Sequence, residues 1–399
     1  MRFLKFNKNW TRYKANDILV TFPTNSLSWD LLSYENISDL KNLHYGLIHN
    51  GFSSSCIDGL NPLFPYINSE HLPSKYELLK NGDLILADAS EDRKDVGRPV
   101  EIIDIKEQNI VAGLHTIHAR DNTNLIISGY KSFYFQSKAM KQQLYKVSNG
   151  SKIFGISPSV FKELIMLIPC KEEQEKIVNL LRKLEDKIDT QIKIIDEYES
   201  ALNYIKDEVL WNIKDTKKYT VKDILSPINI KSTIQDEDPV LSSTVKGLFL
   251  QSEYFGKNIS SENNIGYKKV KFGNIIISPQ NLWMGNITYN NKFEKGIVSP
   301  SYHIFEVNLG FNPIYISLLL KSHKALYLYK SVSEQGASVV RRNLNIEAFN
   351  ELCFSIPKID VQNKIAEIIT IVNNKINIEA DYLAILNKQK QFLLNNLFV

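Results

Sequence analysis

Acidic residues and a lysine in the first half of the chain have a spacing found in metal-dependent nucleases. Asp88 precedes the tripeptide Asp104-Ile105-Lys106, and a carboxylate upstream of a D-x-K on a strand can hold Mg²⁺ and activate water. A second tripeptide of this kind, Asp92-Arg93-Lys94, lies between them, and the charged end of a strand also explains both. A DNA nuclease that acts alone therefore stays open as an alternative.

A methyltransferase would need different residues. Two segments, Asn61-Pro62-Leu63-Phe64 and Asn312-Pro313-Ile314-Tyr315, each differ by one residue from the N-P-P-[YF] loop with which amino-methyltransferases hold a target amine. No two of the 17 glycines are separated by a single residue, so the chain has no G-x-G-x-x-G loop for a nucleotide cofactor. A DNA methyltransferase that acts alone also stays open as an alternative, beside the nuclease.

His115 and His118 have the spacing of metal ligands on a helix. The residues around them predict a strand, on which side chains three positions apart point to opposite faces, and no further ligand lies near. Three cysteines, Cys56, Cys170 and Cys353, are too far apart for a zinc site. The sequence therefore predicts no metal site.

These residues belong to a chain that repeats itself. The pattern P-x-x-x-x-Q-x-K-I begins at Pro169 and returns at Pro357, 188 residues later. Upstream, the segment 82–86 (Gly-Asp-Leu-Ile-Leu) resembles the segment 273–277 (Gly-Asn-Ile-Ile-Ile). Because further matching blocks occur in the same order, the sequence predicts two copies of one domain.

Each copy ends in a long helical pattern. Apolar residues recur every seven positions from Ile177 to Val209 and again from Ile365 to Leu397, as they do in a coiled coil. This narrow period favours two helices that pack on each other over helices that only cover their own domains. Gln191 and Glu379 interrupt the two seams at equivalent places, so we predict that they fix the register of the coil.

The segments before the helices contain short apolar or alternating runs between turn residues, as strands do. Leu125–Ile127 is one expected strand, Pro313–Tyr329 is an expected helix, and the first copy has extra residues, mostly between Leu19 and Gly82. The predicted fold class is α+β, with two mixed α/β domains related by pseudo-twofold symmetry and separated by a long antiparallel two-helix coiled coil. The expected boundaries are 1–169 for the first domain, 170–215 for the first helix, 216–357 for the second domain and 358–399 for the second helix.

Several loops combine basic, amide and small side chains, the mixture that reads base edges and grips phosphates in DNA. The candidates for DNA contact in the first domain are Arg93, Lys94, Arg98, Ser148, Gly150 and Lys152. The candidates in the second domain are Gln280, Asn281, Trp283, Gln335, Gly336, Ser338, Arg341 and Arg342. Gly150 and Gly336 would let the backbone approach a phosphate closely, although each loop also fits an ordinary turn.

Two α/β segments, each followed by P-x-x-x-x-Q-x-K-I and a long heptad helix, resemble the specificity subunit of type I restriction-modification enzymes. The resemblance covers essentially the whole chain and includes the blocks Gly82 to Leu86 and Ser278 to Trp283. One departure is that Cys170 and Lys358 stand where a second proline often follows in the family. Only the local turn is affected by this departure.

This resemblance implies two target recognition domains that each read one half of a bipartite site in double-stranded DNA. It also implies partner subunits: methyltransferase (modification) subunits that carry S-adenosylmethionine, and restriction translocase-nuclease subunits that use ATP and Mg²⁺. The chain itself would then be a non-catalytic specificity subunit without a cofactor of its own.

Composition sets the remaining limits. The net charge of +4 is too weak to identify a partner. The apolar runs are far shorter than a membrane-spanning helix, and residues 1–10 lack the apolar segment of a secretory signal, so we expect a cytoplasmic protein. A purely structural coiled-coil linker is a third hypothesis, and it predicts no salt-dependent affinity for DNA.

Overall fold

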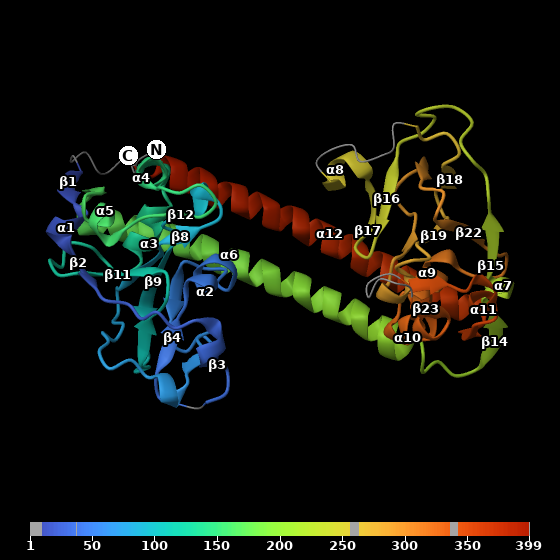
Figure 1. The fold of residues 1–399 in the computed structure, drawn as a ribbon, viewed down its shortest axis with the longest axis horizontal. Helices are drawn as coiled ribbons and strands as arrows, with labels where there is room; N and C mark the ends of the chain where they lie inside the picture. The colour runs from blue at the N-terminus through green and yellow to red at the C-terminus, as the bar shows by residue number, and fades with distance from the viewer. Residues whose placement is uncertain (1–9, 37, 256–262, 336–341, 399) are drawn as a thin grey trace. The chain divides into compact units, whose positions relative to one another are not determined.

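The computed structural model describes residues 10–36, 38–255, 263–335 and 342–398. It divides into two compact units, of which the first comprises Met1–Ile194 with Ala380–Val399 and the second comprises Ile195–Glu379. Each unit contains one α/β domain together with parts of two long helices (Figure 1). The predicted α+β class with two mixed domains is confirmed.

The first unit is built on a five-stranded sheet. Its strands, in spatial order, are β2 (Leu19–Phe22), β11 (Thr116–Asp121), β7 (Leu84–Ala87), β9 (Pro99–Asp104) and β5 (Cys56–Asp58). Neighbouring strands run antiparallel, except that β5 is parallel to β9. All four residues of β7 are buried, so this strand lies at the centre of the domain.

The second unit repeats the core of that sheet with four strands. They are, in spatial order, β15 (Leu225–Ile228), β22 (His303–Val307), β19 (Ile275–Ile277) and β20 (Ile287–Tyr289). The antiparallel trio β15-β22-β19 corresponds to the trio β2-β11-β7 of the first unit. Gly82 and Gly273, which precede the two central strands, have φ angles of +83° and +88°, a conformation that glycine adopts without strain.

The smaller elements repeat in the same order along both units. In the first unit they are β1 (Thr11–Lys14), α1 (Ala15–Ile18), α3 (Tyr130–Gln136), α4 (Lys138–Val147), α5 (Pro158–Lys162) and β13 (Ile165–Ile168). In the second unit they are β14 (Thr216–Thr220), α7 (Val221–Ile224), α9 (Pro313–Leu320), α10 (His323–Ser331), α11 (Ile346–Asn350) and β25 (Cys353–Pro357). β1 pairs antiparallel with β13, and β14 pairs antiparallel with β25, so each domain is closed by strands from its two ends.

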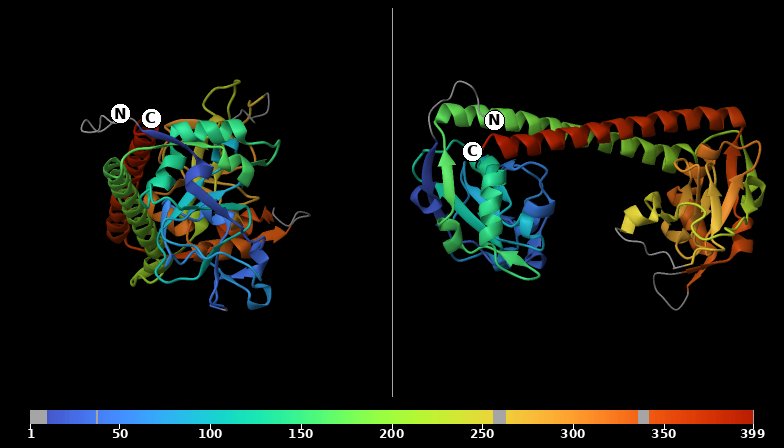
Figure 2. Two further views of the ribbon diagram at one scale, coloured as in Figure 1. Left: turned by 90° about the vertical axis from the view of Figure 1, so that its left-hand side faces the viewer. Right: turned by 90° about the horizontal axis from the view of Figure 1, so that it is seen from above.

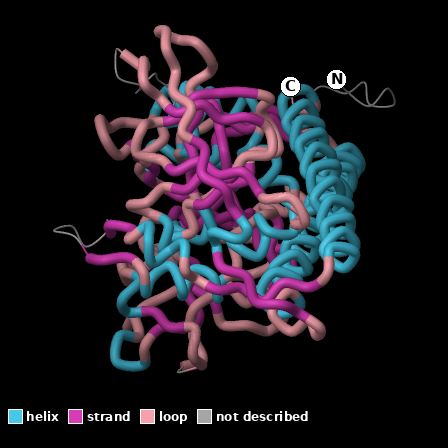
Figure 3. Tube along the Cα trace, turned by 90° about the vertical axis from the view of Figure 1, so that its right-hand side faces the viewer, coloured by secondary structure: helices cyan, strands magenta, loops and turns pink. Residues whose placement is uncertain are grey.

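The two domains differ most in the segment that follows the first strand of the trio. In the first unit this segment supplies η1 (Trp29–Leu31), β3 (Leu32–Ser33), β4 (Lys41–Leu43), α2 (Tyr45–Asn50), β5, β6 (Tyr66–Ile67) and η2 (Ser69–His71). Strands β4, β6 and β3 form a second sheet with β10 (Ile110–Ala112). In the second unit the pairs are β16 (Leu241–Thr244) with β17 (Gly247–Leu250) and β18 (Lys268–Lys271) with β21 (Lys295–Val298), and α8 (Gln251–Phe255) follows β17 (Figure 1). Figure 3 shows strands in magenta and helices in cyan.

Short two-stranded sheets lie at the candidate loops. In the first unit β8 (Ala89–Ser90) pairs with β12 (Phe154–Gly155), and η3 (Arg93–Asp95) follows β8. In the second unit η5 (Leu282–Met284) follows β19, and β23 (Ser333–Gln335) pairs with β24 (Arg342–Leu344).

Two expectations about local structure are wrong. Leu125–Ile127 is not a strand, because the amide of Ile126 donates to Asp121 Oδ2 and the amide of Ile127 donates to Gln174 Oε1 instead of to a neighbouring strand. The expected helix Pro313–Tyr329 is two helices, α9 and α10, because the side chain of Ser322 caps a new helix by accepting from the amide of Ala325.

The long helices are α6 (Lys171–Tyr204), which continues as the π-helical turn η4 (Ile205–Val209), and α12 (Ile359–Asn396). In the first unit Leu184 and Ile188 of α6 pack on Leu386 of α12. The ribbons of the two helices lie side by side there (Figure 2). In the second unit Ile205 of η4 and Ile365 of α12 join the core of the domain. In each unit the start of one helix therefore meets the end of the other, as an antiparallel pair requires. None of the described helices is long and apolar enough to cross a membrane.

The glutamine of the repeated motif makes equivalent hydrogen bonds in both units. Gln174 Nε2 donates to the carbonyl of Pro169, and Gln362 Nε2 donates to the carbonyl of Pro357. Their Oε1 atoms accept from the amides of Ile127 and Asn312, which lie ahead of α3 and α9. Each buried glutamine therefore ties the start of its long helix to its own domain.

Candidate nucleic-acid interface

The structure brings the two candidate loops of the first domain together. Arg93 of η3 donates from Nε to Ser148 Oγ at 3.1 Å and from Nη2 to the carbonyl of Ser148 at 3.0 Å. Its guanidinium also lies over the rings of Tyr145 and Phe154, at 4.5 and 5.7 Å from their centroids. Arg93 therefore holds the loop 92–98 against the turn 148–155 with donors that DNA would otherwise use.

Ser148 and Gly150 serve the shape of the turn. Ser148 is buried and its hydroxyl donates to the carbonyl of Tyr145. Gly150 has a φ of +142°, and a Cβ atom there would lie 1.9 Å from the carbonyl oxygen of Ile153. Only glycine permits this close approach, so Gly150 is required by the turn itself. Lys152, at the tip, is exposed.

A basic cleft lies along the same loop. Lys94 and Arg98, both exposed, line a hollow of about 170 Å³ together with Lys141 of α4 and Asp95. Burial lowers the pKa of Lys141, and the positive charge of Arg98 lowers it further, although Asp95 raises it. Three cations against one carboxylate suit a phosphate, and we call this hollow the basic cleft. Lys141 was missed because it lies in a helix far from the loop in sequence.

The equivalent loops of the second domain also meet. The guanidinium of Arg342, at the start of β24, lies 5.1 Å from the centroid of the Trp283 ring in η5. The amide of Arg342 donates to the carbonyl of Gln280 at 3.2 Å. Gln280 is exposed and Asn281 is half-buried beside it, so amide side chains flank the stacked pair. The candidates Gln280, Asn281 and Trp283 of one loop thus lie next to Arg342 of the other loop.

The remaining candidates of the second domain are described less fully. The backbone of Gln335 ends β23, opposite Arg342. Gly336, Ser338 and Arg341 lie outside the described residues.

Beside the loop 92–98 the first unit has a second hollow, of about 560 Å³, which sequence reasoning missed. We call it the aromatic pocket; among its lining residues are Trp29, Tyr45, His49, Arg98, His115 and Ile153. Most of these come from the extra segment of the first copy or from strand ends. The concentration of tryptophan, tyrosine and histidine in that segment is the signal that sequence reasoning could have used.

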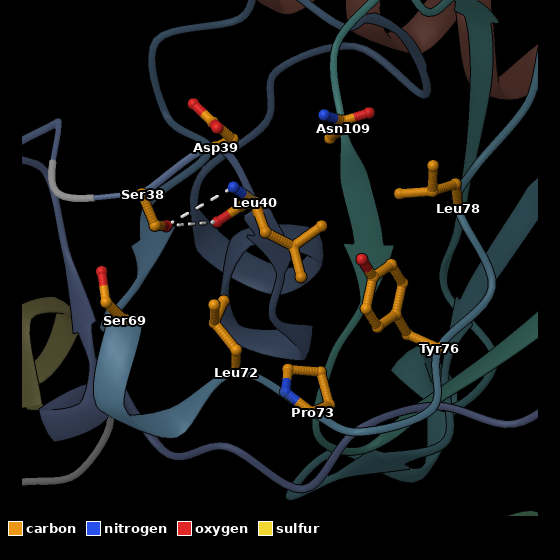
Figure 4. Close-up of a pocket in the computed structure, with 9 residues that line it drawn as sticks. All are labelled: Ser38, Asp39, Leu40, Ser69, Leu72, Pro73, Tyr76, Leu78 and Asn109. Carbon is orange, nitrogen blue, oxygen red and sulfur yellow. Dashed lines mark hydrogen bonds between the residues drawn. The ribbon is translucent and has the colours of Figure 1, made fainter.

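Another hollow of the first unit, of about 530 Å³, lies beside the second sheet (Figure 4). Its lining residues are Ser38, Asp39, Leu40, Ser69, Leu72, Pro73, Tyr76, Leu78 and Asn109. One carboxylate and no basic side chain line it, so it does not suit the DNA backbone.

The residues considered for nuclease chemistry do not converge. Asp88 follows the end of β7, whereas Asp104 ends β9, and these strands are antiparallel, so the two carboxylates lie at opposite ends of the pair. Asp88 pairs with His115 at 3.3 Å, and Asp104 pairs with Lys106 at 2.6 Å.

His118 is a core residue. Its Nε2 contacts Asp83 Oδ2 at 2.7 Å, and both side chains are fully buried. Arg120 also donates to Asp83, and these two partners lower the pKa of Asp83 against the effect of burial. Across the described residues, no group of three histidine, cysteine or acidic side chains is placed to hold a metal ion.

The two residues predicted to fix the register lie in different units. Gln191 of α6 is buried in the first unit, and Glu379 of α12 is half-buried in the second. Their proposed role stays a prediction.

Comparison with known proteins gives a consistent result. Residues 66–200 match the model of the family described as "Type I restriction modification DNA specificity domain". This segment includes the loop 92–98, the turn 148–155 and the first part of α6. No curated protein matches the chain.

Solved structures resemble the chain along almost its whole length. The S subunit of a type I restriction-modification system from M. genitalium is 14% identical with a TM-score of 0.56, over 99% of this chain and 98% of that one. A chain solved in work on the assembly and conformational transition of the type I R-M system is 12% identical with a TM-score of 0.57, over 98% and 97%. At this identity the likeness shows a shared fold.

Proposed function

We propose that the chain is a type I restriction-modification DNA specificity subunit, because residues 66–200 match the specificity-domain model and a solved S subunit has the same fold. Each α/β domain reads one half of a bipartite site in double-stranded DNA. One observation supports this proposal: two equivalent loops contact each other in both repeats. Arg93 contacts Ser148 in the first domain, and Trp283 contacts Arg342 in the second. A repeat that keeps one surface in both copies is what a two-part site requires.

The salt dependence of DNA binding tests this proposal. In the full chain, Lys94→Gln and Arg98→Gln should each flatten the slope of log K against log salt by about 0.9, the value for one lost phosphate contact. Lys187→Gln, at an exposed lysine on α6, is the matched control and should leave the slope unchanged. Equal slopes for all three variants and the unaltered chain would contradict contact by this loop.

We further propose that methyltransferase subunits dock on the outer face of α12. Large apolar side chains on this helix are exposed, namely Ile359, Val361, Ile368, Ile371, Ile378, Tyr382, Ile385 and Phe392. Four of them, from Ile371 to Phe392, are seven residues apart, the spacing of a second coiled-coil seam. On α6 only Leu180 and Tyr204 are exposed among the described large apolar residues. The partner surface therefore belongs chiefly to α12.

Co-purification of the full chain with its methyltransferase subunit tests the docking face. Ile378→Asp and Ile385→Asp each place a charge in the apolar stripe, so the double variant should lose the partner. Asn377→Asp with Ala384→Asp introduces the same charges at neighbouring exposed positions and should keep it. Retention of the partner by both double variants would show that it docks elsewhere.

The chain acts without a catalytic site of its own in this proposal. The separation of Asp88 from Asp104–Lys106 supports it, because a hydrolytic site needs these groups together. S-adenosylmethionine would then be bound by the methyltransferase subunits, and ATP and Mg²⁺ by restriction translocase-nuclease subunits, in the cytoplasm where their DNA lies. DNA cleavage or methylation by the purified chain, supplied with Mg²⁺ or S-adenosylmethionine, would refute it.

A further inference from the structure

The walls of the aromatic pocket are held in place by contacts within the first domain. The ring of Trp29 lies 4.5 Å from that of His44, with their planes 40° apart. Gly46 makes room for it, because a Cβ atom there would lie 3.2 Å from the indole ring. Tyr45 meets His115 edge to face at 5.2 Å. These rings form a surface that exists before any ligand binds.

The polar groups around the pocket are fixed as well. Arg98 donates from Nη1 to the carbonyl of His49 at 2.8 Å, and the ring Nε2 of His49 lies 2.9 Å from the carbonyl of Ala89. Glu91 and Asp95 line the pocket and are exposed, whereas Trp29 keeps 42% and Ile153 63% of its surface accessible. The pocket thus offers ring faces, an apolar edge, one guanidinium and two carboxylates.

This charge pattern distinguishes bases from phosphates. Two carboxylates beside one guanidinium repel a phosphate, but a carboxylate accepts from the amino group of cytosine and a guanidinium donates to guanine. Aromatic and apolar side chains contact the methyl group of thymine at the edge of its base pair. The chemistry of the aromatic pocket is therefore that of base recognition.

The basic cleft adjoins the aromatic pocket along the same loop. Asp95 and Arg98 line both hollows, while Lys94 and Lys141 line only the basic cleft. A phosphate held in the basic cleft would bring the adjoining bases to the aromatic pocket, because both surfaces share Arg98. The basic cleft thus suits a phosphate of a DNA strand, and the aromatic pocket suits the bases next to that phosphate.

From these observations we propose that the aromatic pocket reads base edges of the first half-site, with Trp29 and Glu91 as specificity-determining residues. The proposal rests on the DNA-reading function proposed above and assigns it to side chains. It also gives the extra segment of the first copy a purpose, because Trp29, Tyr45 and His49 come from that segment.

Selection from a randomised double-stranded DNA library tests the assignment in the full chain. Glu91→Gln removes a carboxylate but keeps its size, and it should change the preferred base at one or two positions of one half-site by about 5- to 100-fold. Trp29→Ala should relax the same half-site. The controls Glu35→Gln and Tyr34→Ala change an exposed acid and an exposed aromatic ring outside the pocket and should select the unaltered site.

The half-sites are told apart by a variant of the second domain. Trp283→Ala should change the bases selected in the other half-site, which Glu91→Gln and Trp29→Ala leave unchanged. Wild-type preference at both half-sites in Glu91→Gln and Trp29→Ala, with DNA still bound, would overturn the pocket assignment alone. Absence of any bipartite motif for the unaltered chain would instead overturn the proposed function on which it rests.

Discussion

The two candidate DNA-contact surfaces are built by one plan, in which the two loops exchange the arginine and the aromatic ring. In the first domain the arginine comes from the loop after β7, and Arg93 stacks on Tyr145 and Phe154. In the second domain the ring comes from the loop after β19, and Trp283 lies under Arg342 of the hairpin. The repeated fold therefore fixes where the two loops meet, but not which residue each contributes. The side chains at these loops can therefore differ while the scaffold is kept.

The joints between domain and helix show the opposite behaviour. Gln174 and Gln362 share two equivalent hydrogen bonds, so this joint is retained in the repeat, and Gln174 Nε2 also donates to the carbonyl of Leu125. The first unit adds a buried ion pair, in which Lys390 of α12 lies 2.6 Å from Glu185 of α6. The hydroxyls of Ser54 and Ser55 also donate to Glu185. The extra contacts bind the first domain to both helices.

The largest effect should come from that added contact. Glu185→Ala leaves Lys390 partly buried without its carboxylate and strips the two serines of their acceptor, which should cost the first unit about 3–5 kcal/mol of unfolding free energy. Hydrogen exchange in the full chain would measure each unit separately. Glu197→Ala, at an exposed position of α6, should stay within about 0.5 kcal/mol. A loss shared equally by both units would break the comparison.

The glutamine joints should respond alike. Gln174→Ala leaves the amide of Ile127 unpaired, and Gln362→Ala does the same to that of Asn312, so each should cost its own unit about 1–3 kcal/mol. Faster exchange of these two amides would report the loss, with exposed Gln142→Ala as the control. If only one unit were weakened, the two joints would not be equivalent.

Acid should weaken the first unit through His44. Burial lowers the pKa of His44 from 6.5 to about 4, with a smaller contribution from His115. The unfolded chain binds this proton below about pH 6.5 while the folded chain does not, so stability is complete above that pH and falls toward pH 4. The loss should reach up to about 2 kcal/mol at pH 5.

His44→Asn is the matched variant for the pH experiment. Its side-chain oxygen can still accept from the amide of Gly46, as His44 Nδ1 does, but it does not titrate. Denaturant unfolding at pH 7 and pH 5 should therefore show a smaller difference for this variant. The same difference in both proteins would exclude His44 as the source.

The smallest effect concerns the stacked pair of the second domain. Trp283→Leu removes the ring under Arg342 and should loosen the hairpin β23–β24 by about 0.5–1 kcal/mol. Met284→Leu changes an exposed neighbour and serves as the control. Hydrogen exchange at Asn343 would sharpen the comparison, since unaltered exchange would mean that the stack does not hold this loop.

Local patterns predicted much of this structure, because they reflect constraints within a few residues. The seven-residue spacing gave both long helices, and the repeated glutamine marked both joints. The candidate loops stay a prediction, and the sequence did not indicate that Arg93 donates to Ser148, because the two residues are 55 positions apart. The aromatic pocket escaped for the same reason, as its rings come from separate elements that only folding brings together.

The central proposal is that the two domains read separate half-sites, and it predicts that the spacing of the half-sites follows the length of the long helices. Inserting seven residues beside Gln191 and seven beside Glu379 keeps both seams and adds about 10.5 Å to each helix. DNA selected from a library with randomised spacers should then contain the same two half-sites, roughly 3 base pairs further apart at 3.4 Å per base pair. Recovery of the original spacer, or of altered half-sites, would contradict the account.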